Sequence, residues 1–376
     1  MMPMTHFDVL VAGAGPAGSA CATLMAHSGL NVLLCDKEQF PRDKICGDCI
    51  NPGCWKYFEL LGVADPLRKL DLHRIESARM ANLSGKQITV PVRATPSRPF
   101  FSIKRSTLDN LLVQNAEREG VSLLQQTRFL DATFSDMWNV VVRSKNGLET
   151  YSCDYLVGAD GRNSTIANKI GAWSRKNPSK TARRVGIQWH ADVQPRVGSE
   201  VQLYTIKEGY FGIVNVDVQN SNVAMVTSPD IARDALANLP RFIERTVYSN
   251  PIIGRYATQI EPRCGVVTTY PVNPIRRHWN HPKALLVGDA RQTVEPFTGE
   301  GVLFALDDGA RAARQISTLF YKKVRRTARP RANFWVNRVV SPTLRNQKLV
   351  ESLVWVASEI SWLPRLFART VFRTSL

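Results

Sequence analysis

Hydrophobic and polar positions predict a β-α-β unit at the start of this chain. Residues 7–12 and 31–35 are short apolar runs, which are typical of strands buried on both faces of a parallel sheet. Between them, residues 19–28 have a helical pattern that ends at Gly29, a residue type that commonly stops helices.

Later segments predict a second, mostly antiparallel sheet. Strand-like stretches of alternating character occur at residues 185–193, 201–206, 211–218 and 223–227. Short strands interrupted by prolines are expected between residues 70 and 101. Helices are predicted at residues 105–120 and 301–320, and the apolar run 284–287 predicts a return to the buried parallel sheet.

The composition is that of a folded globular protein. The 376 residues are 44% hydrophobic and 22% charged, which excludes a disordered, collagen-like or coiled-coil chain. The length indicates two domains with an extension. Seven cysteines are too few for a disulfide scaffold, and the chain enters an apolar strand without a secretory start. No apolar run approaches the roughly 20 residues of a membrane-spanning helix. We expect a reducing, cytoplasmic setting.

Positive charge is concentrated at the C-terminal end. The chain carries 49 Lys+Arg against 32 Asp+Glu, a net charge of +17. Residues 321–376 contain twelve basic and two acidic side chains, so this tail supplies more than half of the net charge. The asymmetry predicts an anionic partner for the tail. Nucleic acid is the least favoured partner, because no recognised nucleic-acid-binding module accompanies the charge.

The tail also has an apolar pattern at helical spacing, formed by Leu349, Leu353, Val356, Ile360 and Leu363. After Pro364, arginines at positions 365, 369 and 373 lie among apolar and aromatic residues. A basic amphipathic helix of this kind suits the anionic inner face of a membrane. The alternatives are an acidic partner protein, or a terminal helix that packs its apolar side on its own domain.

A glycine motif, Gly13-x-Gly15-x-x-Gly18, follows the first strand and opens the helix, with Pro16 and Ala17 inside it. In this pattern the first Gly allows the turn, the second lets a pyrophosphate approach, and the third lets helix and strand pack closely. The helix N-terminus directs free amides at the phosphates. Asp36 ends the second strand, where it can accept hydrogen bonds from a ribose, and Lys37 follows it. The motif predicts a dinucleotide, either NAD or FAD.

Two later segments choose between these dinucleotides. One strand runs into the turn Asp160-Gly161, and another ends at Gly288-Asp289 before the loop 295–301 and a helix. With these segments in this order, the sequence resembles the FAD-dependent group that includes aromatic hydroxylases, flavin halogenases and geranylgeranyl reductases. The resemblance implies FAD as the cofactor. NAD(P)H would bind only transiently as electron donor, since no second glycine-rich motif is present.

The resemblance also implies roles for individual residues. Asp289 would hold a ribityl hydroxyl, Arg105 would lie near the FAD, and the Asp160-Gly161 turn is linked in this group to FAD and pyridine nucleotide. The loop against the isoalloxazine would contain Pro296, Gly299, Glu300 and Gly301. The helix that starts near Gly301 would direct its amides at the N1–C2=O region of the flavin.

Residues 41–52 are most similar to the geranylgeranyl-reductase-like branch, which has Pro-x-x-Lys-x-Cys-Gly here. Lys44, Cys46 and Gly47 match that segment. Reductases of this branch also carry Tyr-x-Trp-x-Phe-Pro, whereas residues 210–215 of this chain read Tyr-Phe-Gly-Ile-Val-Asn. Gly212 replaces the Trp and the Pro is absent, which argues against polyprenyl reduction.

The segment Cys46-Gly47-Asp48-Cys49 has the spacing of a zinc or redox pair. Zinc would need a second pair, which the other cysteines do not supply at the right spacing, so no metal is expected. A redox disulfide stays open as an alternative. The favoured interpretation is a backbone turn beside the flavin, with one or both cysteines lining the pocket.

Candidates for acid/base catalysis are His190, Tyr210 and Glu300. A lone His on a strand is more often structural, and Glu300 is better suited to shaping the flavin loop. No nucleophile–base arrangement indicates hydrolysis.

The predicted fold is α/β, with a Rossmann-like FAD-binding domain of the glutathione-reductase type, an antiparallel substrate domain and a helical C-terminal extension. The expected divisions are residues 1–70, 103–178 and 264–320 for the FAD-binding domain, 71–102 and 179–263 for the substrate domain, and 321–376 for the extension.

Three functions are compatible with this sequence. The favoured one is a monooxygenase that hydroxylates a bulky aromatic or apolar substrate. That substrate could be an aromatic side chain of a partner protein, because the group resembles flavoproteins that mature peptide-derived quinone cofactors. The second is a double-bond reductase of a prenyl or lipid substrate, which the amphipathic tail favours. The third is an FAD-stabilised binding or assembly protein.

Overall fold

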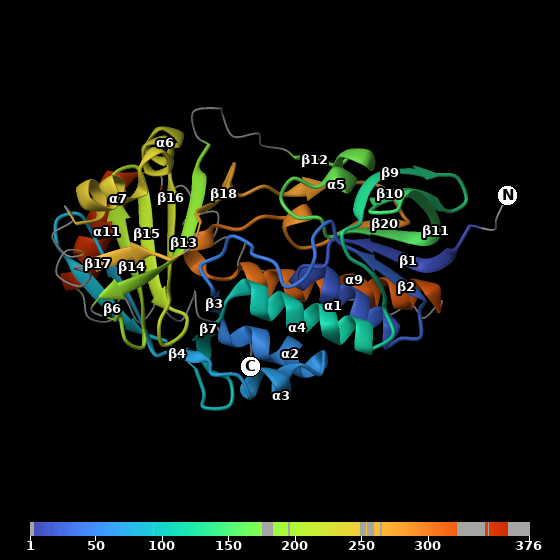
Figure 1. Ribbon diagram of the computed structural model, residues 1–376, viewed down its shortest axis with the longest axis horizontal. Helices are drawn as coiled ribbons and strands as arrows, with labels where there is room; N and C mark the ends of the chain where they lie inside the picture. Colours follow the sequence, from blue (N-terminus) through green and yellow to red (C-terminus); the bar gives the residue numbers. More distant parts are fainter. Residues whose placement is uncertain are drawn as a thin grey trace.

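The chain folds around two large sheets that lie at opposite ends of the long axis of the molecule (Figure 1). The computed structural model describes residues 4–92, 94–174, 183–194, 196–248, 253, 259–263, 265–321, 343–344 and 346–359. The fold is α/β, as the sequence predicts.

The first sheet has a parallel centre with an antiparallel flank. Its parallel strands are β8 (Ser122–Leu124), β2 (Val32–Cys35), β1 (His6–Ala12), β11 (Gly147–Gly158) and β20 (Ala284–Leu286). The flank is formed by β10 (Trp138–Ser144) and β9 (Arg128–Phe134). The buried apolar runs of β1 and β2 explain their central position, because both faces of a parallel strand are covered.

Three long helices lie together along one side of this sheet: α1 (Pro16–Ala26), α4 (Arg105–Arg118) and α9 (Gly301–Phe320) (Figure 1). Small residues let α1 and α9 touch. A Cβ on Gly309 of α9 would stand 2.3 Å from the carbonyl oxygen of Ala17, so only glycine fits there. The middle of α9 is therefore held against the first turn of α1.

Shorter elements complete the chain around the two large sheets. They are β3 (Cys49–Ile50), η1 (Pro52–Cys54), α2 (Trp55–Leu60), α3 (Ala64–Arg68), β4 (His73–Ile75), β7 (Phe100–Ser102), α5 (Thr165–Lys169), β12 (Trp173–Ser174), β19 (Arg277–His278), η4 (Gly288–Ala290) and η5 (Pro296–Thr298). Strands β3, β7 and β4 form a small sheet between the two large ones.

The second large sheet is antiparallel except for one pair. Its order is β17 (Gln259–Pro262), β13 (Val185–Gln194), β16 (Ser221–Thr227), β15 (Gly209–Asn215), β14 (Glu200–Ile206), β5 (Ser77–Ala81) and β6 (Gln87–Pro91), with β18 (Val267–Thr269) beside β13. The exception is the parallel pair of β14 and β5.

The two faces of this sheet differ, because successive strand residues point to opposite sides. Trp189, Tyr204 and Phe211 pack on one face with α6 (Pro229–Ala237), α7 (Leu239–Phe242) and the π-helical turn η3 (Ile243–Val247). Gln188 and His190 lie on the other face, where both bond to residues 46–48 of the first domain. The sheet therefore turns its more polar side towards the first domain.

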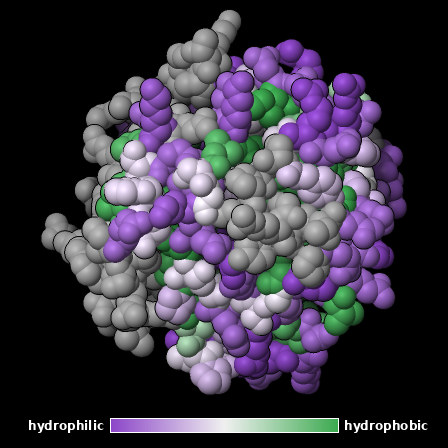
Figure 2. Space-filling view, turned by 90° about the vertical axis from the view of Figure 1, so that its left-hand side faces the viewer, coloured by the Kyte–Doolittle hydropathy of each residue, from purple (hydrophilic) through white to green (hydrophobic). Residues whose placement is uncertain are grey.

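The C-terminal tail contributes one described helix, α11 (Gln347–Glu359), which packs beside β6. Its buried residues are Val350 and Val354, whereas Leu349 and Leu353 are 44% and 47% exposed. Leu349 and Leu353 of the apolar repeat thus lie off the face that packs, Val356 is half-buried, and Ile360 and Leu363 lie outside the described residues. The face of the molecule at this end carries hydrophobic side chains in separate patches among hydrophilic ones (Figure 2).

Most of the basic tail lies outside the described residues, including the arginine stripe after Pro364. Its anionic partner therefore stays a prediction. Among the helices that the structure describes, none is both long enough and apolar enough to cross a membrane.

Glu351 fastens α11 to the second sheet. Its carboxylate accepts hydrogen bonds from the Leu83 amide at 3.0 Å and from the Thr205 hydroxyl at 2.9 Å. Glu359 on the same helix makes only an exposed ion pair with Lys86.

Replacing Glu351 by alanine should destabilise the protein by about 1–3 kcal/mol, because two partly buried donors lose their acceptor. The Glu359→Ala control should cost less than about 1 kcal/mol, as exposed ion pairs do. Urea unfolding of both variants compares the two losses. Equal losses would contradict this account of how α11 is held.

Candidate cofactor and substrate site

Four parallel strands end at the same edge of the first sheet. β1 leads to Gly13, β2 to Asp36, β11 to Asp160 and β20 to Gly288 and Asp289. Because the carboxyl ends of parallel strands share an edge, segments that are far apart in sequence come together there. The structure thus gathers the predicted cofactor residues from these four strands.

The glycine turn leaves room for a ligand at only one of its three glycines. A Cβ on Gly13 would lie 2.3 Å from the Ala159 carbonyl oxygen, and one on Gly18 would lie 1.8 Å from the Gly13 carbonyl oxygen. A Cβ on Gly15 would have only the Arg42 guanidinium nearby, at 3.7 Å. The open side of Gly15 faces a cation at the N-terminus of α1, which fits a pyrophosphate.

Asp36 supports this turn directly. Its carboxylate accepts hydrogen bonds from the Ala14 amide at 2.7 Å and from the Glu38 amide at 2.9 Å. The side chain is buried, and each carboxylate oxygen keeps a further lone pair for a ribose hydroxyl. Lys37 instead forms a half-exposed ion pair with Glu38 at 3.5 Å.

A buried carboxylate holds two arginines beside the turn. Asp109 is fully buried and accepts from Arg105 Nε at 2.8 Å and from Arg105 Nη2 at 2.7 Å. Arg42 Nη1 lies 3.3 Å from the same carboxylate. Two guanidiniums against one carboxylate leave a positive excess suited to phosphate. Sequence reasoning missed Arg42, whose place depends on a partner 67 positions away.

Lys44 and Asp289 face each other across the same edge. Lys44 is exposed at the surface, but the surrounding protein desolvates its ammonium and so lowers its pKa, while the Asp289 carboxylate opposes the shift. Its ammonium lies 3.4 Å from the position a Cβ on Gly161 would take. Asp160 caps the short helix α5, because its carboxylate accepts from the amides of Thr165 and Ile166. Arg277 joins these loops by donating to the carbonyls of Arg162, Asp289 and Ala290.

The turn at residues 46–49 is bonded to the second sheet. Cys46 donates its amide to Gln188 Oε1 at 2.8 Å, and Asn222 donates to the Cys46 carbonyl at 2.9 Å. Asp48 is fully buried with φ +54 and contacts His190 Nε2 at 2.9 Å. His190 thus fastens the turn between the domains. Gly47, at the centre of the turn, would have open space around a Cβ.

Cys46 and Cys49 are unpaired thiols. Burial raises the pKa of both, which keeps them protonated at neutral pH. A protonated thiol is a poor nucleophile, so this environment favours a lining role over redox exchange.

The loop 295–301 is anchored to the second sheet by a buried ion pair. Arg184 Nη2 donates to Glu295 Oε2 at 2.6 Å, and the Tyr210 hydroxyl donates to Glu295 Oε1 at 3.0 Å. The Tyr210 ring meets Phe297 edge-on at 5.3 Å. Glu300 is buried at the N-cap of α9, and Gly299 adopts a φ of +64 just before it. Tyr210 and Glu300 therefore both help to shape this loop.

An apolar row crosses the sheet between two packed clusters. In register across the strands, it consists of Gln188, Ala224, Gly212, Leu203, Met80 and Ile88. On one side Val214 packs with Ile75 and Phe100, and on the other Tyr210 and Val226 pack with Phe297 and Leu344. The row belongs to neither cluster, and five of its six residues are half-buried. We call it the central row.

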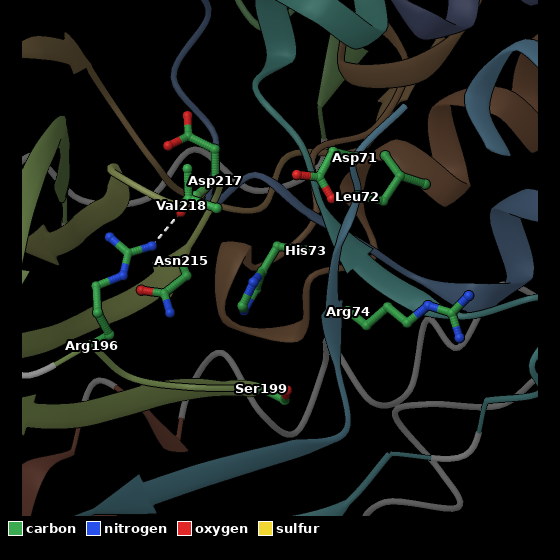
Figure 3. Close-up of a pocket in the computed structure, with 9 residues that line it drawn as sticks. All are labelled: Asp71, Leu72, His73, Arg74, Arg196, Ser199, Asn215, Asp217 and Val218. Carbon is green, nitrogen blue, oxygen red and sulfur yellow. Dashed lines mark hydrogen bonds between the residues drawn. The ribbon is translucent and has the colours of Figure 1, made fainter. Parts of the chain in front are cut away.

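A separate cavity of about 370 Å³ lies where β4 meets the turn after β15 (Figure 3). His73 Nε2 contacts the Gly198 carbonyl at 2.8 Å, Asn215 donates to the same carbonyl, and Arg196 donates to the Asp217 carbonyl. Its polar groups thus join neighbouring segments to one another, and the cavity lies at a seam between β4 and the second sheet.

Three features define a dinucleotide-binding flavoprotein. They are the open space at Gly15, the guanidiniums of Arg42 and Arg105 beside it, and the four strand ends that meet at one edge of the first sheet. The chain belongs to the FAD binding domain family, whose model matches residues 6–325. FAD is its cofactor, and the protein is an FAD-dependent oxidoreductase. The relatives include flavin halogenases and geranylgeranyl reductases, which confirms the group indicated by the sequence.

Individual comparisons span most of the chain. Menaquinone reductase of Mycolicibacterium smegmatis is 30% identical over 324 residues, which cover 84% of this chain and 77% of that protein. A flavoprotein/dehydrogenase from Cytophaga hutchinsonii superposes with a TM-score of 0.83 at 18% identity, covering 97% and 92% of the two chains. Aklavinone-11 hydroxylase in complex with FAD and aklavinone gives a TM-score of 0.71 at 21% identity, covering 85% and 64%.

Gly15→Ala should leave the apo-protein folded but weaken FAD binding at least about tenfold, since the added methyl occupies the space of the pyrophosphate. Gly15 has a φ of −71, which alanine adopts without strain. Gly18→Ala should instead destabilise the apo-protein, because its methyl would collide with the Gly13 carbonyl. Thermal unfolding of the apo-proteins and FAD fluorescence titration separate the two effects. Unchanged FAD affinity in Gly15→Ala would contradict the assignment of Gly15 to the pyrophosphate site.

Proposed function

We propose that this oxidoreductase hydroxylates an aromatic ring of a bulky, apolar substrate that lies on the central row. The observation that carries the proposal is the chemistry of this row. In the middle of the row, Gly212 and Ala224 are small residues that leave space for a substrate. Leu203 and Met80 continue the row with apolar side chains. Neighbouring strands are about 4.8 Å apart, so these positions span the width of an aromatic ring.

The row also bears on the reaction type. Reduction of an isolated double bond needs a proton for the second carbon, and a positioned acid usually supplies it. The six described residues of the central row include no titratable side chain. Gln188, its only polar member, already accepts from the Cys46 amide. The row itself therefore offers no proton donor, and this favours hydroxylation over reduction. His190 and Tyr210 lie on the same face on either side of the row, but they are bonded to Asp48 and Glu295.

The protein's part in this chemistry is to bind, orient and exclude water. Bound FAD would supply the redox step, by taking two electrons from NAD(P)H and passing them to O2. Cys46 and Gln188 form one end of the surface on which the substrate would rest, next to the flavin-loop cluster of Tyr210 and Phe297. Apolar packing would orient the ring towards the flavin.

A second candidate is reduction of a double bond in an apolar chain. It is supported by the relative from Mycolicibacterium smegmatis, a menaquinone reductase at 30% identity. Replacement of the reductase Trp by Gly212 weighs against it in this chain.

Dependence on oxygen separates the two reactions. FAD-loaded protein reduced with dithionite should convert a probe such as 4-dodecylphenol only when O2 is admitted, and isotopically labelled O2 should leave its label in the product. Mass spectrometry of the product is the measurement, with menaquinone as the parallel probe. A product carrying two added hydrogens, formed without O2, would contradict hydroxylation and support the reductase. Flavin inert towards O2 and both probes would favour a binding or assembly protein.

Gly212→Leu should lower turnover of the bulky probe at least about tenfold, because the new side chain fills the middle of the central row. A Cβ at this position already meets the Leu203 methyl at 3.1 Å, and that flexible side chain can yield. FAD affinity should stay as in the wild type, because the central row is on the second sheet and the glycine turn is on the first. Full turnover with normal FAD content would contradict the assigned substrate surface.

A further inference from the structure

Arg184 carries two buried donors that no group in the described part of the chain satisfies. It lies just before β13, and its side chain is 9% exposed. Nη2 donates to Glu295 Oε2 at 2.6 Å and to the Val272 carbonyl at 3.3 Å. Nε and Nη1 are buried and have no hydrogen-bond partner in the part of the chain that the structure describes.

Such donors are rare, because a buried N–H without an acceptor loses its bonds to water and gains nothing in return. Nε–H and Nη1–H point from different edges of the planar guanidinium, so each of them needs an acceptor of its own. The arrangement is explained if a ligand supplies the missing oxygen.

The guanidinium is held firmly in place. The Arg184 amide donates to Asn273 Oδ1 at 3.1 Å, and its carbonyl accepts from the Val272 amide at 2.8 Å. Glu295, its ion-pair partner, is fixed in turn by the Tyr210 hydroxyl. These contacts join the second sheet to the loop 295–301, so Arg184 lies where that loop meets the substrate domain.

The charges around Arg184 favour an electron-rich ligand. Arg162 lies nearby and is half-buried; desolvation lowers its pKa, while Asp289 and Glu295 oppose that shift. Glu295 thus acts on two guanidiniums, Arg162 and Arg184. An oxygen bearing partial or full negative charge is the ligand chemistry that this environment stabilises.

We propose that Arg184 donates a hydrogen bond to an electron-rich ligand oxygen through one of these two unsatisfied donors. Two sources share this chemistry: a carbonyl oxygen of the flavin pyrimidine ring, and an oxygen substituent on the substrate ring. The inference goes beyond the proposed function, because it applies equally to hydroxylation and to double-bond reduction.

Arg184→Lys tests the assignment, because it keeps a cation beside Glu295 and removes the unsatisfied guanidinium donors. Three quantities are measured: the Kd of FAD for the apo-protein, the midpoint potential of the bound flavin, and the Kd of 4-dodecylphenol from the perturbed flavin spectrum. None of these needs turnover, so they remain informative even if hydroxylation is not the reaction. Arg79→Lys is the matched control, since Arg79 makes a two-point pair with Glu200 far from the flavin loops.

If the oxygen belongs to the flavin, Arg184→Lys raises the Kd of FAD at least about tenfold or lowers the flavin potential, because a donor to the electron-rich ring is lost. If it belongs to the substrate, FAD affinity and potential stay constant and the Kd of the phenol rises at least about tenfold.

The proposal is overturned if FAD affinity and potential match the wild type while phenol binding is unchanged or absent in both proteins. Should Arg184→Lys fail to fold, the double variant Arg184→Gln with Glu295→Gln replaces the buried ion pair by two neutral amides. The same three measurements and the same criteria then apply.

Discussion

The structure depends on backbone contacts that tolerate no side chain at the edge of the first sheet. Gly13 lies against Ala159, Gly18 against Gly13, and Gly309 against Ala17, each with no space for a Cβ. These three contacts bring β1, β11, α1 and α9 together at one point. Because α9 begins directly after the loop 295–301, the same packing sets where that loop stands relative to the glycine turn. FAD that reaches from the glycine turn to the loop 295–301 needs a fixed distance between the two.

The second constraint is the polar seam between the domains. Asp48 bonds to His190 and Asn222, and Glu295 bonds to Arg184 and Tyr210. Two different loops of the first domain are thus bonded to the second sheet. Between these bonds lies the central row, which is apolar and belongs to neither neighbouring cluster. Buried polar bonds require specific geometry, whereas an apolar surface adapts to its ligand. The buried polar bonds thus fix the two domains relative to each other, while the apolar central row can adapt to a bulky substrate.

Local motifs made the fold and the cofactor predictable from the sequence. The glycine turn, Asp36 and the Gly288-Asp289 segment each follow a buried strand, and parallel order brings strand ends to one edge. What remained hidden depends on partners distant in sequence. Arg184 and Glu295 are 111 positions apart, and His190 and Asp48 are 142 apart, so no periodicity connects them. The packing face of α11 was also hidden, because Val350 and Val354 form an apolar stripe beside that of Leu349 and Leu353.

The most direct test of the account is a crystal structure of the protein with FAD bound. We expect the pyrophosphate against Gly15 and the N-terminus of α1, and the isoalloxazine against the loop 295–301, with the substrate space between the ring and the central row. A ring bound on another face, or a pyrophosphate away from Gly15, would contradict the central claim that this junction is the redox site.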